Sequence, residues 1–246
     1  MRGKRSGESH FRWRGTEVSR IEGLSDCVFA FALTLLVVSL EVPRTYGELV
    51  HTLRGFPSFA ACFALLGLVW HSHYRFFRRY GLEDLTTIAL NALLLFLVLF
   101  YVYPLKFLFG YLFDMAFGWA EALPGPGGEL ARAPAAPMGF TEMRSLMLFY
   151  GAGFALVFAI FAWMHQHAWR QREELALDPP ERVLTKAAVH SHLLSAGVGI
   201  GSMALVLSWP RHPEVSGLFY CIMGPLHGAH GWLTGRALRR VSPHAD

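Results

Sequence analysis

The stretch RIEGLSDCVFAFALTLLVVSL, residues 20–40, decides the class of this chain. An arginine and the triplet Leu24-Ser25-Asp26 lead directly into an uncharged apolar run. Because about 18 consecutive apolar residues are enough to cross a bilayer as a helix, this segment predicts a membrane span. Ionisable side chains at the mouth of such a helix are costly in lipid, so they mark a functional place.

The composition of the whole chain agrees with this reading of residues 20–40. Apolar residues make up 53% of the 246 residues and charged residues only 16%, which is too little charge for the surface of a soluble domain of this size. The basic, polar residues 1–20 lack the apolar core of a signal peptide. Ahead of a membrane span, such an arm sets topology or contacts anionic lipid rather than nucleic acid.

Hydropathy and length together predict six spans, so the expected fold is an all-α polytopic membrane protein. A cytoplasmic arm (1–20) precedes the six-span domain (21–236), and a short cytoplasmic tail (237–246) follows it. The one long connection, 113–144, is rich in Pro and Gly and is expected to be a flexible tether between two three-span halves. The predicted spans are 24–42, 55–76, 86–112, 145–166, 187–208 and 215–234.

The distribution of Lys and Arg predicts the orientation of these spans. If the N-terminus is cytoplasmic, 16 of the 22 basic residues fall on the cytoplasmic side and 6 on the other side. Cytoplasmic loops carry an excess of Lys and Arg, so both termini are expected in the cytoplasm. The asymmetry also favours an even number of spans.

Ser25 and Asp26 have two interpretations. Either they cap the start of the first span, because Ser and Asp side chains accept hydrogen bonds from free amides at a helix N-terminus. Or Asp26 joins a polar cluster with Arg20 and the histidines of the second span. Arg20 and Asp26 are six residues apart and do not stack on one helical face, so a third group would have to bridge them.

One helical stripe of the first span carries Phe31, Leu35 and Val38, with Thr34 at its flank. Packing or lipid contact explains such a stripe equally well, because every face of a lipid-embedded helix is apolar. Several copies of the helix around an axis would instead stack these side chains into apolar rings that gate ions by excluding water. The Thr34 hydroxyl has a plain alternative role, a hydrogen bond to the preceding turn.

Histidines cluster at span ends, and His71 and His73 lie level with the cytoplasmic end of the first span. Residues two apart point to nearly opposite sides of a helix, so no such pair chelates a metal by itself. Ligands from several spans could still converge on a metal, as in membrane metalloenzymes. The other histidines considered are His165, His167, His190, His192, His227 and His230.

The motifs of several other functional classes are missing from the sequence. It has no nucleotide-binding loop, nucleophile elbow or zinc-protease helix. Carboxylates within the spans are nearly absent beyond Asp26, which argues against a proton-coupled transporter. The selectivity-filter sequence of conventional potassium channels is also missing.

The pattern Arg20-x-x-x-Leu24-Ser25-Asp26 resembles the Arg-x-x-x-Phe-Ser-Asp signature that opens the transmembrane protein 175 family of potassium channels. The resemblance continues through the end of the second span, from Trp70 to Phe77, and into Asn91 and Tyr103-Pro104 of the third. It covers roughly residues 17–112, and in the second half it rests mainly on the number of spans.

The resemblance implies a prokaryotic six-span subunit of the cytoplasmic (inner) membrane that assembles as a homotetramer and is permeable to potassium ions. The first spans would line the pore, with apolar constriction residues at Phe31, Leu35 and Val38 and a selectivity-linked threonine at Thr34. The structural motif would comprise Arg20, Leu24, Ser25, Asp26 and, from the second span, His71 or His73. The resemblance implies no enzymatic activity, cofactor or bound metal, and as partners only potassium ions, further copies of the chain and membrane lipid.

Two positions depart from the family pattern. Leu24 replaces the signature phenylalanine, which is a mild apolar change. Phe31 places a bulky aromatic ring at the narrowest point, where it would close the pore, change its selectivity or require another rotamer to conduct. We therefore predict a potassium-permeable channel, with a histidine-dependent membrane metalloprotein or enzyme as the alternative.

Overall fold

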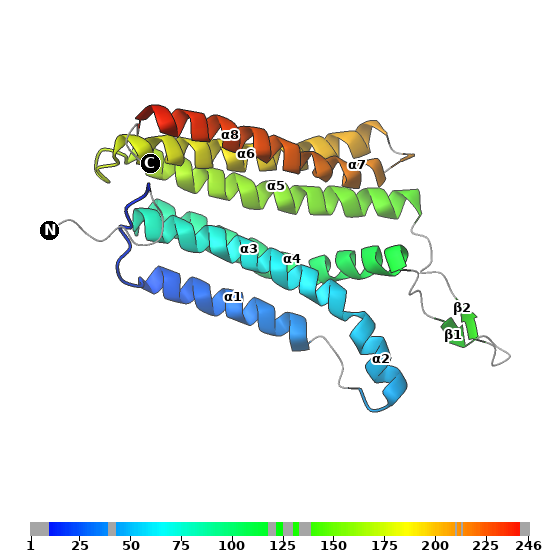
Figure 1. Cartoon of the computed structure of the whole chain (residues 1–246). Coiled ribbons are helices and arrows are strands. Elements are labelled where there is room, and N and C mark those ends of the chain that lie inside the picture. The colour runs from blue at the N-terminus through cyan, green and yellow to red at the C-terminus, as the bar shows by residue number, and fades with distance from the viewer. Residues whose placement is uncertain are drawn as a thin grey trace. The chain divides into compact units, whose positions relative to one another are not determined.

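The computed structural model describes residues 10–38, 43–117, 122–124, 130–132, 139–209, 211–212 and 214–241. Within these ranges the chain is almost entirely helical (Figure 1). The elements are α1 (Arg20–Val38), α2 (Tyr46–Arg54), α3 (Phe56–Tyr80), α4 (Leu85–Phe117), β1 (Ala122–Pro124), β2 (Leu130–Arg132), α5 (Phe140–Arg170), α6 (Pro179–Ser208), α7 (Glu214–Leu218), the 3-10 helix η1 (Phe219–Ile222) and α8 (Met223–Val241).

The predicted all-α class is confirmed, and the two strands are confined to the predicted long connection. β1 and β2 pair antiparallel, with Leu123 opposite Ala131. The predicted tail begins inside α8, which continues to Val241, and residues 242–246 lie outside the described residues.

Five helical segments of the described chain are long and apolar enough to cross a membrane. They correspond to the first five predicted spans, and the second includes α2 as well as α3. The sixth predicted span, 215–234, is helical but is divided into α7, η1 and α8. It is not among the five, so its crossing of the membrane stays a prediction. The five segments are Arg20–Val38, Tyr46–Tyr80, Leu85–Phe113, Phe140–Arg170 and Pro179–Ser208.

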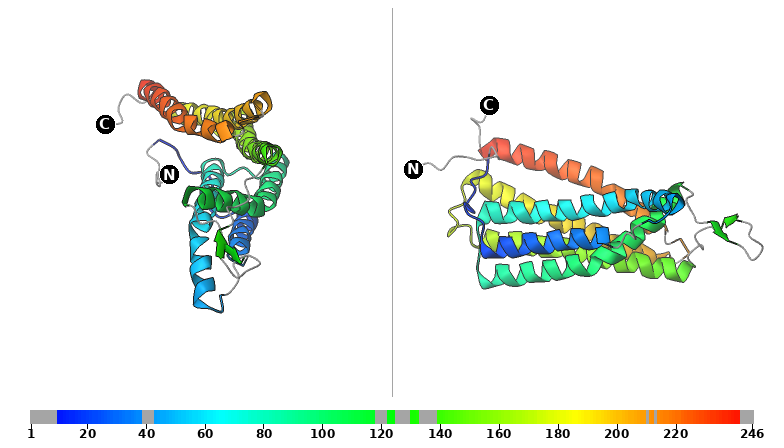
Figure 2. Two further views of the ribbon diagram at one scale, coloured as in Figure 1. Left: turned by 90° about the vertical axis from the view of Figure 1, so that its right-hand side faces the viewer. Right: turned by 90° about the horizontal axis from the view of Figure 1, so that it is seen from below.

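The chain divides into two compact units, and the first comprises the described parts of residues 1–23, 73–94 and 140–246. Here α5 and α6 pack against each other and α8 packs along α6, as the views in Figures 1 and 2 agree. Gly199 allows the two long helices to approach closely. A Cβ at this position would lie only 3.1 Å from both the Gly151 carbonyl oxygen and the Ala155 Cβ. Small residues favour such contacts between membrane helices.

The start of α6 is fixed by a capping box at Asp178. The Asp178 side chain accepts a hydrogen bond from the Glu181 backbone N–H (3.0 Å), and the Glu181 carboxylate accepts one from the Asp178 N–H (3.1 Å). This capping box satisfies two amide groups that a helix start otherwise leaves free. It therefore fixes where α6 begins and where the Glu181 carboxylate lies.

The second unit comprises the described parts of residues 24–72 and 95–139. Its core is a cluster of buried apolar side chains from α1, α3 and α4, including Phe29 and Leu36 of α1. The short helix α2 directly precedes α3. The Thr45 hydroxyl caps the start of α2 by accepting a hydrogen bond from the Glu48 N–H (3.2 Å). α4 continues through Pro104 without a break in its helical bounds.

Candidate pore face and its supporting contacts

α1 begins at Arg20, and its start is built by Ser19 and Glu22. The Ser19 hydroxyl accepts from the Glu22 N–H (3.1 Å), and the Glu22 carboxylate accepts from the Ser19 N–H (3.0 Å). This is a capping box of the Ser-x-x-Glu type. The interpretation of Ser25 and Asp26 as the helix cap is therefore wrong, because both residues lie within the helix.

One face of α1 packs into the second unit. Ser25, Ala32 and Leu36 are fully buried and Phe29 is 3% exposed. These residues follow a spacing of four, three and four, which places them on one side of a helix. Ala32 and Leu36 contribute to the apolar cluster that also contains Cys62 of α3 and Val98 of α4. The buried face therefore fixes the rotation of α1 within its own subunit.

The opposite face of α1 is open in the single subunit. It carries Cys27, Phe31, Thr34 and Val38, again with a spacing of four, three and four, and all four are exposed. Phe31 is 59% exposed and Val38 is 71% exposed. We call these four residues the open face of α1. Three of them are residues predicted to line a pore.

The remaining predicted pore residue, Leu35, lies at the edge of the open face and is partly buried. Leu24, at the mouth, is 61% exposed. The Thr34 hydroxyl donates to the Ala30 carbonyl oxygen (2.9 Å), as expected for a hydroxyl within a helix. In the subunit, this bond holds the Thr34 oxygen against the helix backbone.

Asp26 contacts α3 at the mouth of α1. Its Oδ1 accepts a hydrogen bond from the indole Nε1 of Trp70 (2.8 Å), and both side chains are exposed. One of the two interpretations placed Asp26 in a cluster with Arg20 and the histidines of the second span, and the hydrogen bond seen here comes from Trp70, the residue before His71. Arg20 is exposed at the first position of α1, and its part in a cluster with Asp26 stays a prediction.

His71 and His73 point to different environments, as their spacing predicts. His71 is exposed, whereas His73 is 1% exposed and its Nε2 lies 2.8 Å from Oδ1 of Asn91 on α4. A buried polar pair that satisfies its own hydrogen bond holds two helices in register. His73 therefore joins α3 to α4 within the first unit.

Sequence analysis missed a buried ion pair in the first unit. Arg14, from the arm that precedes α1, pairs with Glu181 of α6, whose side chain is 2% exposed. The same guanidinium donates to the carbonyl oxygens of Leu175 (2.8 Å) and Ala176 (3.3 Å). Phe11 is 1% exposed and packs its ring edge-on against Tyr80. Residues 10–19 are therefore a packed part of the fold. In the sequence, the only signals for this packing were the apolar Phe11 within the basic arm and the helix-capping pattern at Asp178.

The histidines of α5, α6 and α8 fall into separate local contacts. The rings of His165 and His192 stand 4.8 Å apart, and His167 Nε2 lies 2.8 Å from the Asp84 carboxylate. His227 Nε2 lies 3.0 Å from the Ser195 hydroxyl. Among the described residues, no group of three His, Cys, Asp or Glu side chains is arranged to hold a metal ion.

The Asp84 carboxylate, in the turn between α3 and α4, has a pKa lowered to about 2. Partial burial alone would raise this pKa, but hydrogen bonds from the Thr87 backbone N–H and from His167 outweigh it. Asp84 is therefore ionised at neutral pH and holds the start of α4 next to α5.

A family model described as the endosomal/lysosomal potassium channel TMEM175 matches residues 20–101. A protein named potassium channel from Marivirga tractuosa is 36% identical to the chain over 239 residues, which is 94% of each protein. The chain belongs to the TMEM175 family. TMEM175 proteins are channels, so the prediction that the chain is not an enzyme is confirmed, and the alternative of a histidine-dependent membrane enzyme is dropped.

A solved structure of a relative agrees with the assignment of this TMEM175 protein. The crystal structure of a variant of the potassium channel MtTMEM175, in complex with a nanobody fusion protein, matches with a TM-score of 0.79 and 35% identity. The match covers 94% of the chain and 99% of that structure. A TMEM175 homologue from Chamaesiphon minutus shares the fold at a TM-score of 0.53 and 24% identity, over 86% of the chain and 96% of that structure. The chain is thus a multi-pass membrane protein of a potassium channel family.

Proposed function

We propose that the chain forms a potassium-permeable channel in which the open face of α1 lines the pore of a homotetramer. The observation that carries the proposal is the division of α1 into two faces. One face is buried in its own subunit, and the other leaves Phe31, Thr34 and Val38 exposed. Four such helices around an axis would stack these side chains into rings. Apolar rings of this kind gate an aqueous path by excluding water.

The predicted pore residues and Asp26 each have a role in this proposal. Phe31 and Val38 form apolar constrictions, Leu35 flanks them, and Thr34 supplies the polar group that tunes selectivity. Thr34 can do so because a hydroxyl that donates to the helix backbone keeps its lone pairs for a passing cation. Asp26 and Trp70 hold the mouth of α1 against α3.

The proposed orientation places both termini in the cytoplasm of a prokaryotic cell, with the channel in its inner membrane. Support comes from the basic residues of the first unit. The arm carrying Arg14, the end of α3 carrying Arg78 and the turn before α6 meet through hydrogen bonds. Arg78 donates to the Gly15 carbonyl oxygen (2.9 Å), and Arg14 donates to the Leu175 carbonyl oxygen (2.8 Å). Basic residues gathered at one end of several spans favour the cytoplasmic side.

Reversal potentials in a planar bilayer, with potassium on one side and sodium on the other, test the proposal. We expect current that reverses toward the potassium equilibrium potential. Phe31→Ala should raise the single-channel conductance because it removes an aromatic ring from the constriction. Phe96→Ala is the matched control, since Phe96 of α4 is similarly exposed (62%) but lies outside the open face. Equal conductance in wild type and Phe31→Ala would exclude Phe31 from the constriction.

The contribution of Asp26 is tested by assembly. We expect Asp26→Ala to lower the fraction of tetramer in size-exclusion chromatography with light scattering. Trp70→Phe removes the same hydrogen bond while keeping the carboxylate and the aromatic ring. An intact, conducting tetramer in Asp26→Ala would refute the role of Asp26 in assembly.

A further inference from the structure

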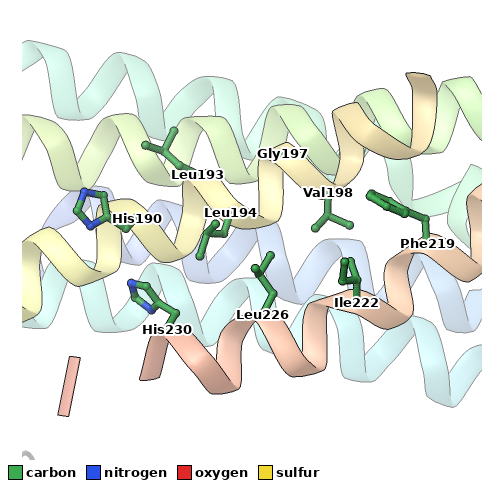
Figure 3. A pocket seen from close by; sticks show the side chains of 9 residues that line it. All are labelled: His190, Leu193, Leu194, Gly197, Val198, Phe219, Ile222, Leu226 and His230. Carbon is green, nitrogen blue, oxygen red and sulfur yellow. The ribbon is translucent and has the colours of Figure 1, made fainter. Parts of the chain in front are cut away.

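A groove of about 580 Å³ lies between α6, η1 and α8. All the residues that line it belong to the first unit, whereas the open face of α1 belongs to the second. Its lining is polar at one end only. His190 and His230 face each other there, and the rest is apolar side chains up to Phe219 (Figure 3). Gly197 leaves the middle of the groove open, because a Cβ at this position would meet nothing within 4 Å. The volume falls within the range of small-molecule sites, about 300–1,000 Å³.

The depth of the two histidines in a bilayer follows from the length of α6. Trp209, directly after the end of α6, is 60% exposed, and exposed tryptophans prefer the membrane–water interface. His190 lies 19 residues earlier, which corresponds to about 28 Å along a helix. The hydrocarbon core of a bilayer is about 30 Å thick. With Trp209 at one interface, His190 therefore lies at the level of the other.

The length of the groove matches a single leaflet. From His190 to Val198 the α6 side of the groove spans eight residues, or about 12 Å of helix. One leaflet of the hydrocarbon core is about 15 Å deep. The groove therefore has its polar end at the headgroups of one leaflet and its apolar end near the middle of the bilayer. This is the polarity profile of one phospholipid.

The charge near the polar end favours an anionic headgroup. Lys186 lies one helical turn before His190 on α6, with its ammonium 4.5 Å from the centroid of the Trp169 ring. On the other side of the groove, α8 continues from His230 to Arg239 and Arg240 in its last turn. Imidazole N–H groups donate to phosphate oxygens, and basic pockets between membrane helices bind anionic lipid headgroups.

We propose that this groove is a binding site for one anionic phospholipid of the leaflet at the His190 end. The phosphate accepts hydrogen bonds from His190 and His230, and an acyl chain lies along Leu194 and Leu226 toward Phe219. The lipid covers apolar surface of α6 and α8 that the subunit leaves open, and so attaches α8 to α6. This site does not depend on ion conduction, so it stands or falls separately from the proposed pore.

Photo-crosslinking tests the site. The protein is reconstituted into phosphatidylcholine vesicles doped with phosphatidylglycerol that carries a diazirine on one acyl chain, and labelled peptides are mapped by mass spectrometry. We expect labels on the peptides containing Leu194 and Leu226. A Cβ at Gly197 would meet nothing within 4 Å, so Gly197→Leu extends a side chain into the groove and should reduce this labelling severalfold. Gly228→Leu is the matched control on α8, since Gly228 also has open space but does not line the groove.

The headgroup is tested by competition. In the wild type, unlabelled phosphatidylglycerol should displace the probe better than unlabelled phosphatidylcholine does. In the His190→Leu/His230→Leu variant, the two unlabelled lipids should displace the probe equally well. If Gly197→Leu does not fold, as judged by circular dichroism and gel filtration, Leu226→Trp fills the groove from the other side. Labelling that survives a filled groove, or that maps elsewhere, overturns the proposal. A disulfide linking two copies through Leu194→Cys would place a second copy in the groove and overturn it as well.

Discussion

Replacing Arg14 with alanine should destabilise the first unit more than the loss of an exposed charge does. The guanidinium pairs with Glu181, whose side chain is 2% exposed, while Arg14 itself is 11% exposed. Arg14 also donates to two carbonyl oxygens in the turn before α6, those of Leu175 and Ala176. The turn includes Ala176 at φ +45°, a backbone conformation that alanine rarely adopts and that the surrounding contacts must hold.

The size of the effect follows from the partner that is left behind. Removing one member of a buried ion pair typically costs about 3–5 kcal/mol, because the other charge stays buried. Glu181 keeps hydrogen bonds from the backbone N–H groups of Arg12 (2.8 Å) and Asp178 (3.1 Å). We therefore expect the lower end of this range, about 3 kcal/mol. For a chain of this size that corresponds to a melting temperature lower by roughly 6–12 °C.

Thermal unfolding of the detergent-purified protein, followed by circular dichroism, measures this loss. The matched control is Glu173→Ala, because the Glu173 side chain is 67% exposed and forms surface ion pairs with Arg172 and Arg182. Exposed pairs contribute about 0–1 kcal/mol, so the control should melt close to the wild type. Glu181→Gln in the Arg14→Ala background should recover part of the loss by removing the uncompensated charge. If the Arg14→Ala variant has the same melting temperature as the control, the arm is not a packed part of the fold.

Three further predictions concern helix packing and acid stability. Gly199→Val should cost about 1–3 kcal/mol by overpacking the contact of α5 with α6, whereas Gly197→Val, with open space around it, should melt like the wild type. Tyr80→Phe removes the hydrogen bond from the buried phenol to the Thr185 hydroxyl (2.9 Å) and should lower the free energy of unfolding by about 1 kcal/mol, as a denaturant titration would detect. Asp84 has a pKa of about 2 in the folded chain against 3.8 for the free group, so its contribution is complete above pH 3.8 and is lost as the pH falls from there to about 2. Allowing for its partial exposure, we expect about 1 kcal/mol, and melting curves of Asp84→Asn across this window should lack that part of the pH dependence.

Sequence was sufficient to place the first five spans, because long apolar runs have few alternatives to a membrane helix. The sequence also contains the signal for the observed start of α1, because Ser19 and Glu22 fit the Ser-x-x-Glu capping pattern. The Ser25-Asp26 pair is an equally good local signal for a helix start, so the sequence alone did not decide between the two positions. The pairing of Arg14 with Glu181 was beyond local reasoning. The two residues are 167 positions apart, and a basic arm before a span is normally assigned to lipid or water.

The faces of α1 could not be separated by sequence for a different reason. Hydrophobic periodicity marks the core side of a helix only when the other side is polar, and here both sides are apolar. The structure separates them by packing, with Phe29 and Leu36 buried and Phe31 and Val38 open. Leu35 was predicted on the same stripe as Phe31 and Val38, but it lies at the edge of the open face. Cys27 lies on the open face, although the sequence analysis did not include it there.

In the proposed tetramer, the exposure of Phe31 links conduction to assembly. A side chain packed within its own subunit has its rotamer fixed there, but the Phe31 ring is 59% exposed, so neighbouring copies set its rotamer in the proposed tetramer. In the proposed tetramer, the distance between copies at the mouth would depend on how α1 is held against α3, and Asp26 and Trp70 make that contact within the subunit. We therefore expect Trp70→Phe to change the conductance of the tetramers that still form. We expect this change to disappear in the Phe31→Ala background, because the ring that responds to the spacing is then gone. Additive effects of the two substitutions would mean that the mouth contact and the constriction act independently.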